Sequence, residues 1–574
     1  MFILLVSSLN VFIWIITFGS TLANTDCRCF PGDECWPTPP EWAAFNKTIN
    51  GRLIATVPIA SVCHHDILTS YDPVKCQQLQ DDWLLPETHY TTPSSIMAQF
   101  FANFSCDPFT LPSAQCVLGT YVQYAVNATS PDDYRKTMAF AMARNIRFVI
   151  RNTGHDYFGK STGAGALALW THNMKDTTFL DYQSSHYTGR AMRIGAGLQV
   201  WEALEAAHAQ GLVVAGGQCQ TVGVAGGYSQ GGGHSLMASQ IGLGADQVLE
   251  WEVVTTSGQH LVATPERNAD LYWALSGGGG GTYAAVLSVT LKAYADVEVA
   301  AGAFTVSKAG NEGISDDRFS SIVKEWLQNL PELVDSGGAA LWSFAEGYLS
   351  ISPVVGPNMT VPELRGLLSR TFQALNESGM TYWSDFAHFP TFLDAWNTMN
   401  PPQEVTDGNM GAYLLPRDLV TSRLSASTLL DALNNLTTGT GVFTGGLAFN
   451  VARGRGITRP VANSINPAWN TAIQYLAFGL LSANKHSWDL ITNVYAPTLN
   501  ELVPGGLSSY VNEGNPFDPN WKRVFYGDNY DRLLDIKDKY DPDGILYGKT
   551  SVGSDRWKTT EDGRLCKAHM DHGA

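Results

Sequence analysis

Two short glycine-rich segments carry the side chains with the most evident chemistry. The first, Arg151–Tyr157, reads Arg-Asn-Thr-Gly-His-Asp-Tyr and contains His155, and the second, Gly216–Gly227, contains Cys219. A neutral imidazole and a thiolate are both nucleophiles, and glycine lets the backbone come close to a flat or anionic ligand. Two nucleophiles in two such loops suggest a cofactor that is held covalently at two points.

The cysteine count points to Cys219 independently. The chain has nine cysteines, of which seven lie in the first 116 residues and the last two are Cys219 and Cys566. An odd number in a secreted protein leaves one thiol unpaired, and Cys219 stands apart from the N-terminal group. The other eight are enough for four disulfides, whose connectivity the sequence does not reveal. The alternatives are that Cys219 is only a buried free thiol, or that another cysteine is the unpaired one.

The N-terminus predicts secretion. A mostly apolar run ends near Phe18 and is followed by Gly-Ser-Thr-Leu-Ala23, which is typical of a signal peptide over residues 1–23. An uncleaved anchor is the alternative because the usual basic start is missing, but the run is short, and no later segment predicts a membrane span. Six glycosylation sequons fit the secretory pathway: Asn46, Asn103, Asn127, Asn358, Asn376 and Asn435.

Length and charge narrow the class of protein further. A chain of 574 residues predicts two or three domains. Its net charge of −17 has no compensating basic stretch, so neither a nucleic acid nor an anionic membrane surface is expected as a partner.

The order of predicted elements places the two loops in one domain. Residues 24–114 form a lead rich in cysteine and proline, and a regular α/β pattern occupies 115–296. Ser130 and Pro131 predict a helix start, and 146–150 predicts a strand that leads into the His155 loop. A strand at 212–215 leads into the Cys219 loop, and 248–256 with 260–263 predicts a hairpin.

The rest of the chain is less regular. Residues 297–505, rich in aromatics and proline, are expected to form a second domain that shapes a substrate cavity. Residues 506–574 are expected to complete the first domain, with an active-site strand over Tyr510–Glu513 followed by a helix.

The glycine loops match neither common nucleotide motif. The sequence has no Gly-x-x-x-x-Gly-Lys-Ser/Thr, and the glycines around Gly223 and at Gly277–Gly281 do not form Gly-x-Gly-x-x-Gly between a first strand and helix. The residues alone therefore indicate a dinucleotide or flavin site of unidentified type.

Four motifs in one order resemble a known family: Arg151–Tyr157, the Cys219 loop, Asp270–Tyr283, and the tail with Tyr510 and Asn512. Together they look like the berberine-bridge-enzyme-like branch of the vanillyl-alcohol-oxidase superfamily, and most like secreted fungal FAD-linked oxidoreductases such as isoamyl alcohol oxidase. The resemblance spans about 110–296 and 505–560. It implies an α+β fold with a two-lobed PCMH-type FAD-binding domain and a separate α/β substrate domain over the flavin.

The resemblance also implies roles for individual residues. His155 would bond the flavin 8α-methyl group and Cys219 the ring carbon C6. Valine at the position of Val222 goes with access of dioxygen to the flavin, which favours an oxidase. The remaining cofactor contacts would come from Arg151, Asn152, Thr153 and Gly154 at the pyrophosphate, and from Gly223, Gly226, Gly227 and Asn512 elsewhere along the cofactor.

The general base departs from the family pattern. Many members read Tyr-x-Asn-Tyr and use the second tyrosine, whereas this chain reads Tyr510-Val-Asn-Glu513. Glu513 could replace that base, with a pKa raised by an apolar pocket, or it could be an ordinary solvated or hydrogen-bonded glutamate. Tyr510 is the other candidate, and its alternative is a packed aromatic. His234 is predicted to be structural, and His64 and His65 show no metal-ligand spacing.

These observations favour a secreted FAD oxidase. It would remove hydride from a C–H beside a hydroxyl or amine of a small molecule and pass the electrons to dioxygen, giving hydrogen peroxide. One alternative is a flavin-dependent biosynthetic enzyme that performs oxidative ring closure or cyclisation. Another is a secreted binding protein with a redox-silent fold, which would be colourless.

Overall fold

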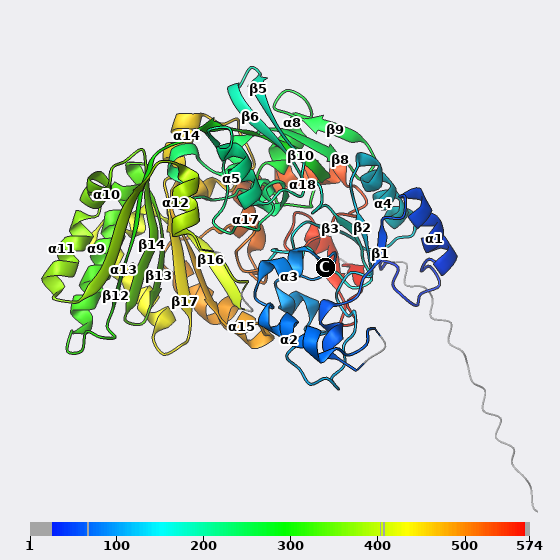
Figure 1. Cartoon of the computed structure of the whole chain (residues 1–574), viewed down its shortest axis with the longest axis horizontal. Helices are drawn as coiled ribbons and strands as arrows, with labels where there is room; N and C mark the ends of the chain where they lie inside the picture. The colour runs from blue at the N-terminus through cyan, green and yellow to red at the C-terminus, as the bar shows by residue number, and fades with distance from the viewer. Residues whose placement is uncertain (1–25, 66–67, 402, 406–407, 569–574) are drawn as a thin grey trace, which may run out of the picture.

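The computed structural model describes residues 26–65, 68–401, 403–405 and 408–568. The predicted signal peptide, residues 1–23, lies outside this range. The chain folds into two lobes that lie side by side in Figure 1, with the N- and C-terminal segments in the right-hand lobe. Among the described residues, no helix combines the length and apolar character that a membrane span needs.

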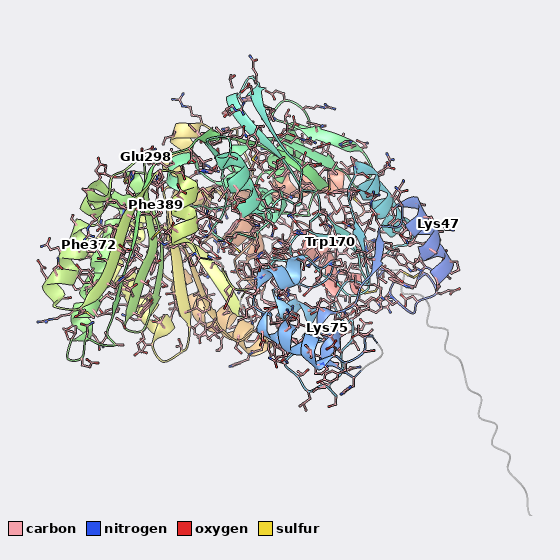
Figure 2. The ribbon with its side chains drawn as sticks, in the orientation of Figure 1. Lys47, Lys75, Trp170, Glu298, Phe372 and Phe389 are labelled. Carbon is pink, nitrogen blue, oxygen red and sulfur yellow. A yellow bond between two sulfur atoms is a disulfide. The ribbon has the colours of Figure 1, made fainter. Side chains whose placement is uncertain are left out.

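A four-stranded sheet positions the His155 loop. Its order is β1-β2-β4-β3, with β1 at Leu53–Ala55, β2 at Tyr124–Asn127, β3 at Phe148–Arg151 and β4 at Leu167–Trp170. Both β2 and β3 run parallel to β4, and Trp170 marks the end of β4 in Figure 2. The predicted helix is α4, Pro131–Ala143, whose first turn is capped by the Ser130 hydroxyl. Since β3 ends at Arg151, the predicted path into the His155 loop is confirmed.

A five-stranded antiparallel sheet lies beside the Cys219 loop. Helix α5, Val200–His208, and the short strand β7, Leu212–Val213, lead the chain into that loop. The predicted hairpin is confirmed as β8 and β9. The sheet order is β5-β6-β10-β8-β9, with β5 at Thr177–Gln183, β6 at Thr188–Gly195, β8 at Val248–Val254, β9 at His260–Ala263 and β10 at Ala285–Lys292.

The left-hand lobe is built on a seven-stranded antiparallel sheet. Helices cover one face, where Phe372 packs 5.1 Å (ring centroids) from Phe304 of the sheet; Figure 2 labels Phe372 in this lobe. The opposite face turns toward the other lobe (Figure 1). The strand order is β15-β12-β14-β13-β17-β18-β16.

The bounds of this lobe's elements are as follows. The strands are β12 Val299–Ser307, β13 Ala339–Ala345, β14 Tyr348–Pro357, β15 Tyr382–Phe389, β16 Asn409–Pro416, β17 Phe443–Ala448 and β18 Ala472–Leu480. The main helices are α9 Asp316–Asp335, α10 Val361–Leu367, α11 Ser369–Ser378, α12 Phe392–Met399 and α13 Arg423–Thr437.

All nine cysteines lie within the described residues, and Cys219 is the one without a disulfide, as predicted. Cys27 and Cys566 join the two ends of the chain across 539 positions. The other three pairs are local: Cys29–Cys35, Cys63–Cys76 and Cys106–Cys116. The lead is less irregular than expected, because it contains α1 Pro39–Thr48, α2 Pro73–Asp81 and α3 Pro86–Tyr90.

The prediction of a strand over Tyr510–Glu513 is wrong. The backbone amides of Glu513 and Gly514 both donate to the Tyr510 carbonyl, at 3.1 and 3.0 Å, and this closes a turn. A turn holds successive side chains close together, whereas a strand would send them to opposite faces. The helical part of the tail is confirmed as α17, Trp521–Tyr526, and α18, Tyr530–Tyr540.

The sequons differ in accessibility. Asn103, Asn358, Asn376 and Asn435 are exposed. Asn46 and Asn127 are half-buried and their side-chain oxygens are engaged, by the Leu53 amide at 3.0 Å and by Asn173 at 2.8 Å. Glycan attachment stays a prediction at all six, and it is favoured at the four exposed ones.

Candidate active site

Two neighbouring cavities meet at the predicted loops. The larger, of about 380 Å³, is lined by both loops on one side and by the seven-stranded sheet on the other. The smaller, of about 120 Å³, runs into the right-hand lobe. The two cavities share six lining residues: Asn152, Asp156, Ser161, Gly226, Gly227 and Asn512.

His155 and Cys219 are brought together at the larger cavity. Their Nε2 and Sγ atoms lie 3.8 Å apart, and His155 Nε2 lies 2.6 Å from the Thr221 hydroxyl. Burial lowers the pKa of His155 to about 4, so its imidazole is neutral in ordinary buffers. Burial also raises the pKa of the Cys219 thiol, against hydrogen bonds from Thr221 and Val222 that lower it. The histidine is therefore a ready nucleophile, and the cysteine rests as a thiol.

Residues of helix α12 and its C-terminal end, in the left-hand lobe, form hydrogen bonds with the backbone of the Cys219 loop. The Trp396 indole donates to the Gly217 carbonyl at 3.3 Å, and the Asn400 amide donates to the carbonyl of Gln218. Both lobes therefore fix the position of the cysteine.

Asn152 lines both cavities, and only one of the two polar atoms of its amide has a hydrogen-bond partner among the described residues. Its Nδ2 donates to the Ala196 carbonyl at 2.8 Å, while its buried Oδ1 has no partner among the described residues. A Cβ at Gly223 would overlap this amide, which would then have to leave its place at the Ala196 carbonyl. The Gln230 Oε1 at the smaller cavity is also buried without a described partner. Buried polar atoms of this kind normally have partners, and a polar ligand would supply them.

The glycines near the junction leave a path for a ligand. A Cβ on Gly280 would stand 3.1 Å from the Gly227 Cα, and the Asn512 amide donates to the Gly227 carbonyl at 2.7 Å. Two joined cavities with bare backbone and unused polar atoms fit an elongated cofactor that has a ring system at one end, such as FAD. Thr153 and Gly154 line the larger cavity, as does Val222.

Arg151 does not point into either cavity. Its guanidinium is fully buried and donates to the carbonyls of His89, Thr92 and Ser95, which belong to the lead. Burial lowers its pKa to about 9. The side chain therefore ties the lead to the His155 loop, and a contact with the cofactor could come only from its backbone. Gly154, at φ +86°, is needed beside it, because a Cβ there would lie 2.8 Å from the guanidinium.

Glu513 lines the larger cavity but is not the isolated carboxyl that was expected. Its two oxygens lie 3.2 and 3.3 Å from His234 Nε2, and its side chain is 23% exposed. Burial alone would raise its pKa, but the charge and hydrogen bond of His234 outweigh burial and hold the pKa below its usual value. The expected raised pKa is therefore wrong, because His234 pairs with the carboxylate.

Two tyrosines complete this corner of the cavity. The Tyr510 hydroxyl accepts hydrogen bonds from the Gly233 amide at 3.1 Å and from Asn512 Nδ2 at 2.7 Å. Burial and the nearby Glu513 charge raise its pKa well above the usual value, so it stays protonated. Tyr475 stacks on His234 with ring centroids 5.3 Å apart.

Sequence reasoning missed His234 as a site residue. It lies 279 positions from Glu513, so no local pattern links them. The available signal was its place directly after Gly231–Gly233, since a glycine run beside a polar residue often marks a close approach of backbone to a site.

Comparisons with known proteins agree with this geometry. Residues 122–264 match the family described as FAD binding domain, and residues 509–553 match the one described as Berberine and berberine like. FAD-linked oxidoreductase sor8 of Hypocrea jecorina is 44% identical over 554 residues, which cover 96% of this chain and 94% of that protein.

Two other relatives are informative. VAO-type flavoprotein oxidase VAO615 of Thermothelomyces thermophilus is 41% identical over 569 residues, covering 95% of this chain and 96% of that protein. Bifunctional decalin synthase calF of Penicillium decumbens is 38% identical over 564 residues, with the same two coverages.

The structural match is equally extensive. The crystal structure of the VAO-type flavoprotein MtVAO615 from Myceliophthora thermophila C1 has a TM-score of 0.89 and 40% identity, covering 94% of this chain and 100% of that one. The expected fold, a PCMH-type FAD-binding domain with a separate substrate domain, is therefore confirmed. This chain belongs to the berberine-bridge-enzyme-like FAD-linked oxidoreductases of the vanillyl-alcohol-oxidase superfamily.

Proposed function

We propose that this oxidoreductase is an oxidase of small alcohols or amines, with dioxygen as the electron acceptor. One observation carries the proposal: a carboxylate held ionised at Glu513 faces the cavity that His155 and Cys219 line. The relative VAO615 is described as an oxidase. Val222, within the Cys219 loop, lines the cavity with a short side chain.

FAD would be held by both loops. His155 and Cys219 are the proposed covalent attachment points, which their 3.8 Å separation and the neutral imidazole support. Asn152 and Asn512, with the bare backbone at Gly226 and Gly227, would bind the rest of the cofactor. When bound, FAD accepts a hydride from the substrate carbon and passes two electrons to dioxygen, giving hydrogen peroxide.

Glu513 is the proposed base. Its carboxylate oxygen would take the O–H or N–H proton of the substrate as the hydride leaves the neighbouring carbon, so that one proton and one hydride balance the oxidation. A base placed in this way contributes about 10²- to 10⁴-fold to a rate. His234 positions the carboxylate. The Tyr510 hydroxyl accepts from both of its described partners, so its own proton is free to be donated to a substrate oxygen.

The test begins with purified protein precipitated in acid. Flavin should stay in the pellet, on peptides that contain His155 and Cys219, and free FAD in the supernatant would refute covalent attachment. Aerobic turnover of a simple alcohol should then consume dioxygen and release an equal amount of peroxide. If the purified protein were colourless, the remaining hypothesis would be a secreted binding protein with a redox-silent fold.

Biosynthetic ring closure is the second candidate. The relative calF is described as a decalin synthase. Product formed only from a complex scaffold, with no peroxide from simple alcohols, would favour this function.

We also propose that the protein works after secretion. Four disulfides support an oxidising compartment. The proposed organisation is a signal peptide at 1–23, a lead at 24–114, an FAD domain at 115–296 completed by 506–574, and a substrate domain at 297–505. N-terminal sequencing of the exported protein would test the cleavage after Ala23.

A further inference from the structure

The wall of the larger cavity opposite the two loops is one face of the seven-stranded sheet. Residues in register on neighbouring strands share a face, so β17 and β18 present three successive rows to the cavity. The rows are Leu447 with Tyr475, then Gly445 with Ala477, then Phe443 with Gly479, which pairs onward with Met410. The middle row is thus a trough of small residues between two rows that contain large ones.

Packing does not require the glycine in this trough. A Cβ at Gly445 would meet only the Trp342 carbonyl oxygen, at an ordinary 3.7 Å. A Cβ at the next residue, Gly446, would overlap the Trp342 indole on the far face of the sheet. Gly446 is therefore needed for packing, whereas Gly445 leaves room inside the cavity.

The trough begins beside the proposed base. Tyr475, in the first row, stacks on His234, which holds Glu513. Residues two apart on a strand are separated by about 7 Å, so the third row lies about 14 Å from the first. A molecule with its reacting group at Glu513 can therefore extend over Gly445 and Ala477 toward Phe443, a span longer than one six-membered ring.

The polar groups that line the cavity favour an uncharged ligand. The Tyr475 hydroxyl and Gln218 Nε2 are buried without described partners, and the two residues are only 5% and 7% exposed. None of the described lining residues is a lysine or arginine, whereas Glu513 and Asp156 both line the cavity. An anionic substrate would lose its hydration and gain little in return, because the imidazole of His234, which also lines the cavity, is already paired with Glu513.

We infer that the substrate is a flat, uncharged molecule of at least two fused rings that lies over Gly445 and Ala477 with its hydroxyl or amine toward Glu513. The inference rests on the proposed function only for the placement of the reacting group. The shape and charge of the site follow from the trough and from the lining residues.

Binding probes test the inference in the holoenzyme before its flavin is reduced. Dissociation constants for 2-naphthalenemethanol, benzyl alcohol and 2-naphthoate are measured by anaerobic rapid mixing, from the change in absorbance of the protein-bound flavin that precedes any reduction. The two-ring alcohol should bind about tenfold more tightly than either of the others. Gly445→Ile should remove this preference by raising the constant for 2-naphthalenemethanol about tenfold, while that for benzyl alcohol stays within about twofold.

Controls separate shape from folding. Isoleucine suits a strand better than glycine does, so the melting temperature of Gly445→Ile should equal or exceed that of the wild type. Ala387→Ile introduces the same side chain on the exposed edge strand β15 and should change no dissociation constant. The inference is overturned if Gly445→Ile binds 2-naphthalenemethanol as the wild type does, or if 2-naphthoate binds as tightly as the alcohol.

Peroxide release is assayed separately on the same proteins. The binding preference without peroxide from any alcohol would support the inferred shape and count against the oxidase. Peroxide release from benzyl alcohol, without tighter binding of the two-ring alcohol, would support the oxidase and contradict the inferred shape of the substrate.

Discussion

Cys219 Sγ lies 3.8 Å from His155 Nε2, although the two residues are 64 positions apart. Each follows a strand end, β3 at Arg151 and β7 at Val213, and both side chains contact the Thr221 hydroxyl. Their chemical states differ, because burial keeps the imidazole neutral and the sulfur protonated. The two proposed attachment points for the flavin ring therefore differ in their initial reactivity.

The first prediction is that the histidine bond forms more readily than the cysteine bond. Cys219→Ala should keep nearly full covalent flavin on His155, whereas His155→Ala should keep several-fold less on Cys219, because a thiol with a raised pKa contains little thiolate. Incubating His155→Ala with FAD at higher pH should increase its covalent fraction. Intact-protein mass spectrometry measures both fractions, and complete loading of His155→Ala at neutral pH would contradict the proposed order.

Much of this half of the site could be predicted from the sequence. The strand before each loop and the glycines within it are local signals, and the odd cysteine count, together with the position of Cys219 away from the N-terminal group, favoured Cys219 as the free thiol. The partner of Cys27 could not be predicted, because Cys566 is 539 positions away and only the finished fold brings the ends together. Glu513 lines the cavity, but its pKa depends on His234, which lies 279 positions away in sequence.

The strands of the left-hand lobe could not be predicted from the sequence for a different reason. Along β12, the run Val299–Phe304 is buried on both faces, so the hydrophobic residues do not alternate with polar ones. A strand covered on both sides lacks the two-residue period that identifies strands in a sequence. The trough at Gly445 depends on the register of β17 with β18, which no sequence pattern specified.

The second prediction concerns Glu513 as the base. Glu513→Gln should lower kcat/KM about 10²- to 10⁴-fold while covalent flavin and folding are kept. Its folded pKa lies below the usual 4.5, so the wild type should stay active down to about that pH and lose activity as the pH falls through the lowered pKa. Glu501→Gln, which changes an exposed carboxylate, is the matched control. A wild-type rate in Glu513→Gln would exclude this residue as the base.

The third prediction separates positioning from mere packing at His234. His234→Asn removes the group that lowers the Glu513 pKa, so burial should dominate and the acid limb of the pH–rate profile should move upward by about one unit or more. His388→Asn disrupts an exposed pair with Glu298 and should leave the profile unchanged. If His234 only fills space, its variant would be slower at every pH without a shift of the limb.

The fourth prediction concerns stability. Replacing Cys27 and Cys566 together with serine should lower the free energy of unfolding by about 2–5 kcal/mol, because that disulfide closes a very long loop. The Cys29–Cys35 bond closes a loop of only 6 positions, so its double serine variant should lose less. Denaturant titration of both variants at equal flavin content gives the comparison. Equal losses would show that loop closure does not govern the effect.

The fifth prediction tests the electron acceptor through Val222. Its carbonyl accepts from the Val200 amide at 2.9 Å, which fixes the backbone, so Val222→Leu should change only the space at the cavity wall. Reaction of the reduced enzyme with dioxygen should slow about tenfold or more, equivalent to about 1.4 kcal/mol in the barrier. Anaerobic reduction by substrate and turnover with a dye acceptor should stay within about twofold, and Val222→Ala should keep the dioxygen reaction. Stopped-flow mixing of the reduced enzyme with dioxygen measures the step directly. Unchanged reoxidation in Val222→Leu would mean that dioxygen reaches the ring by another route.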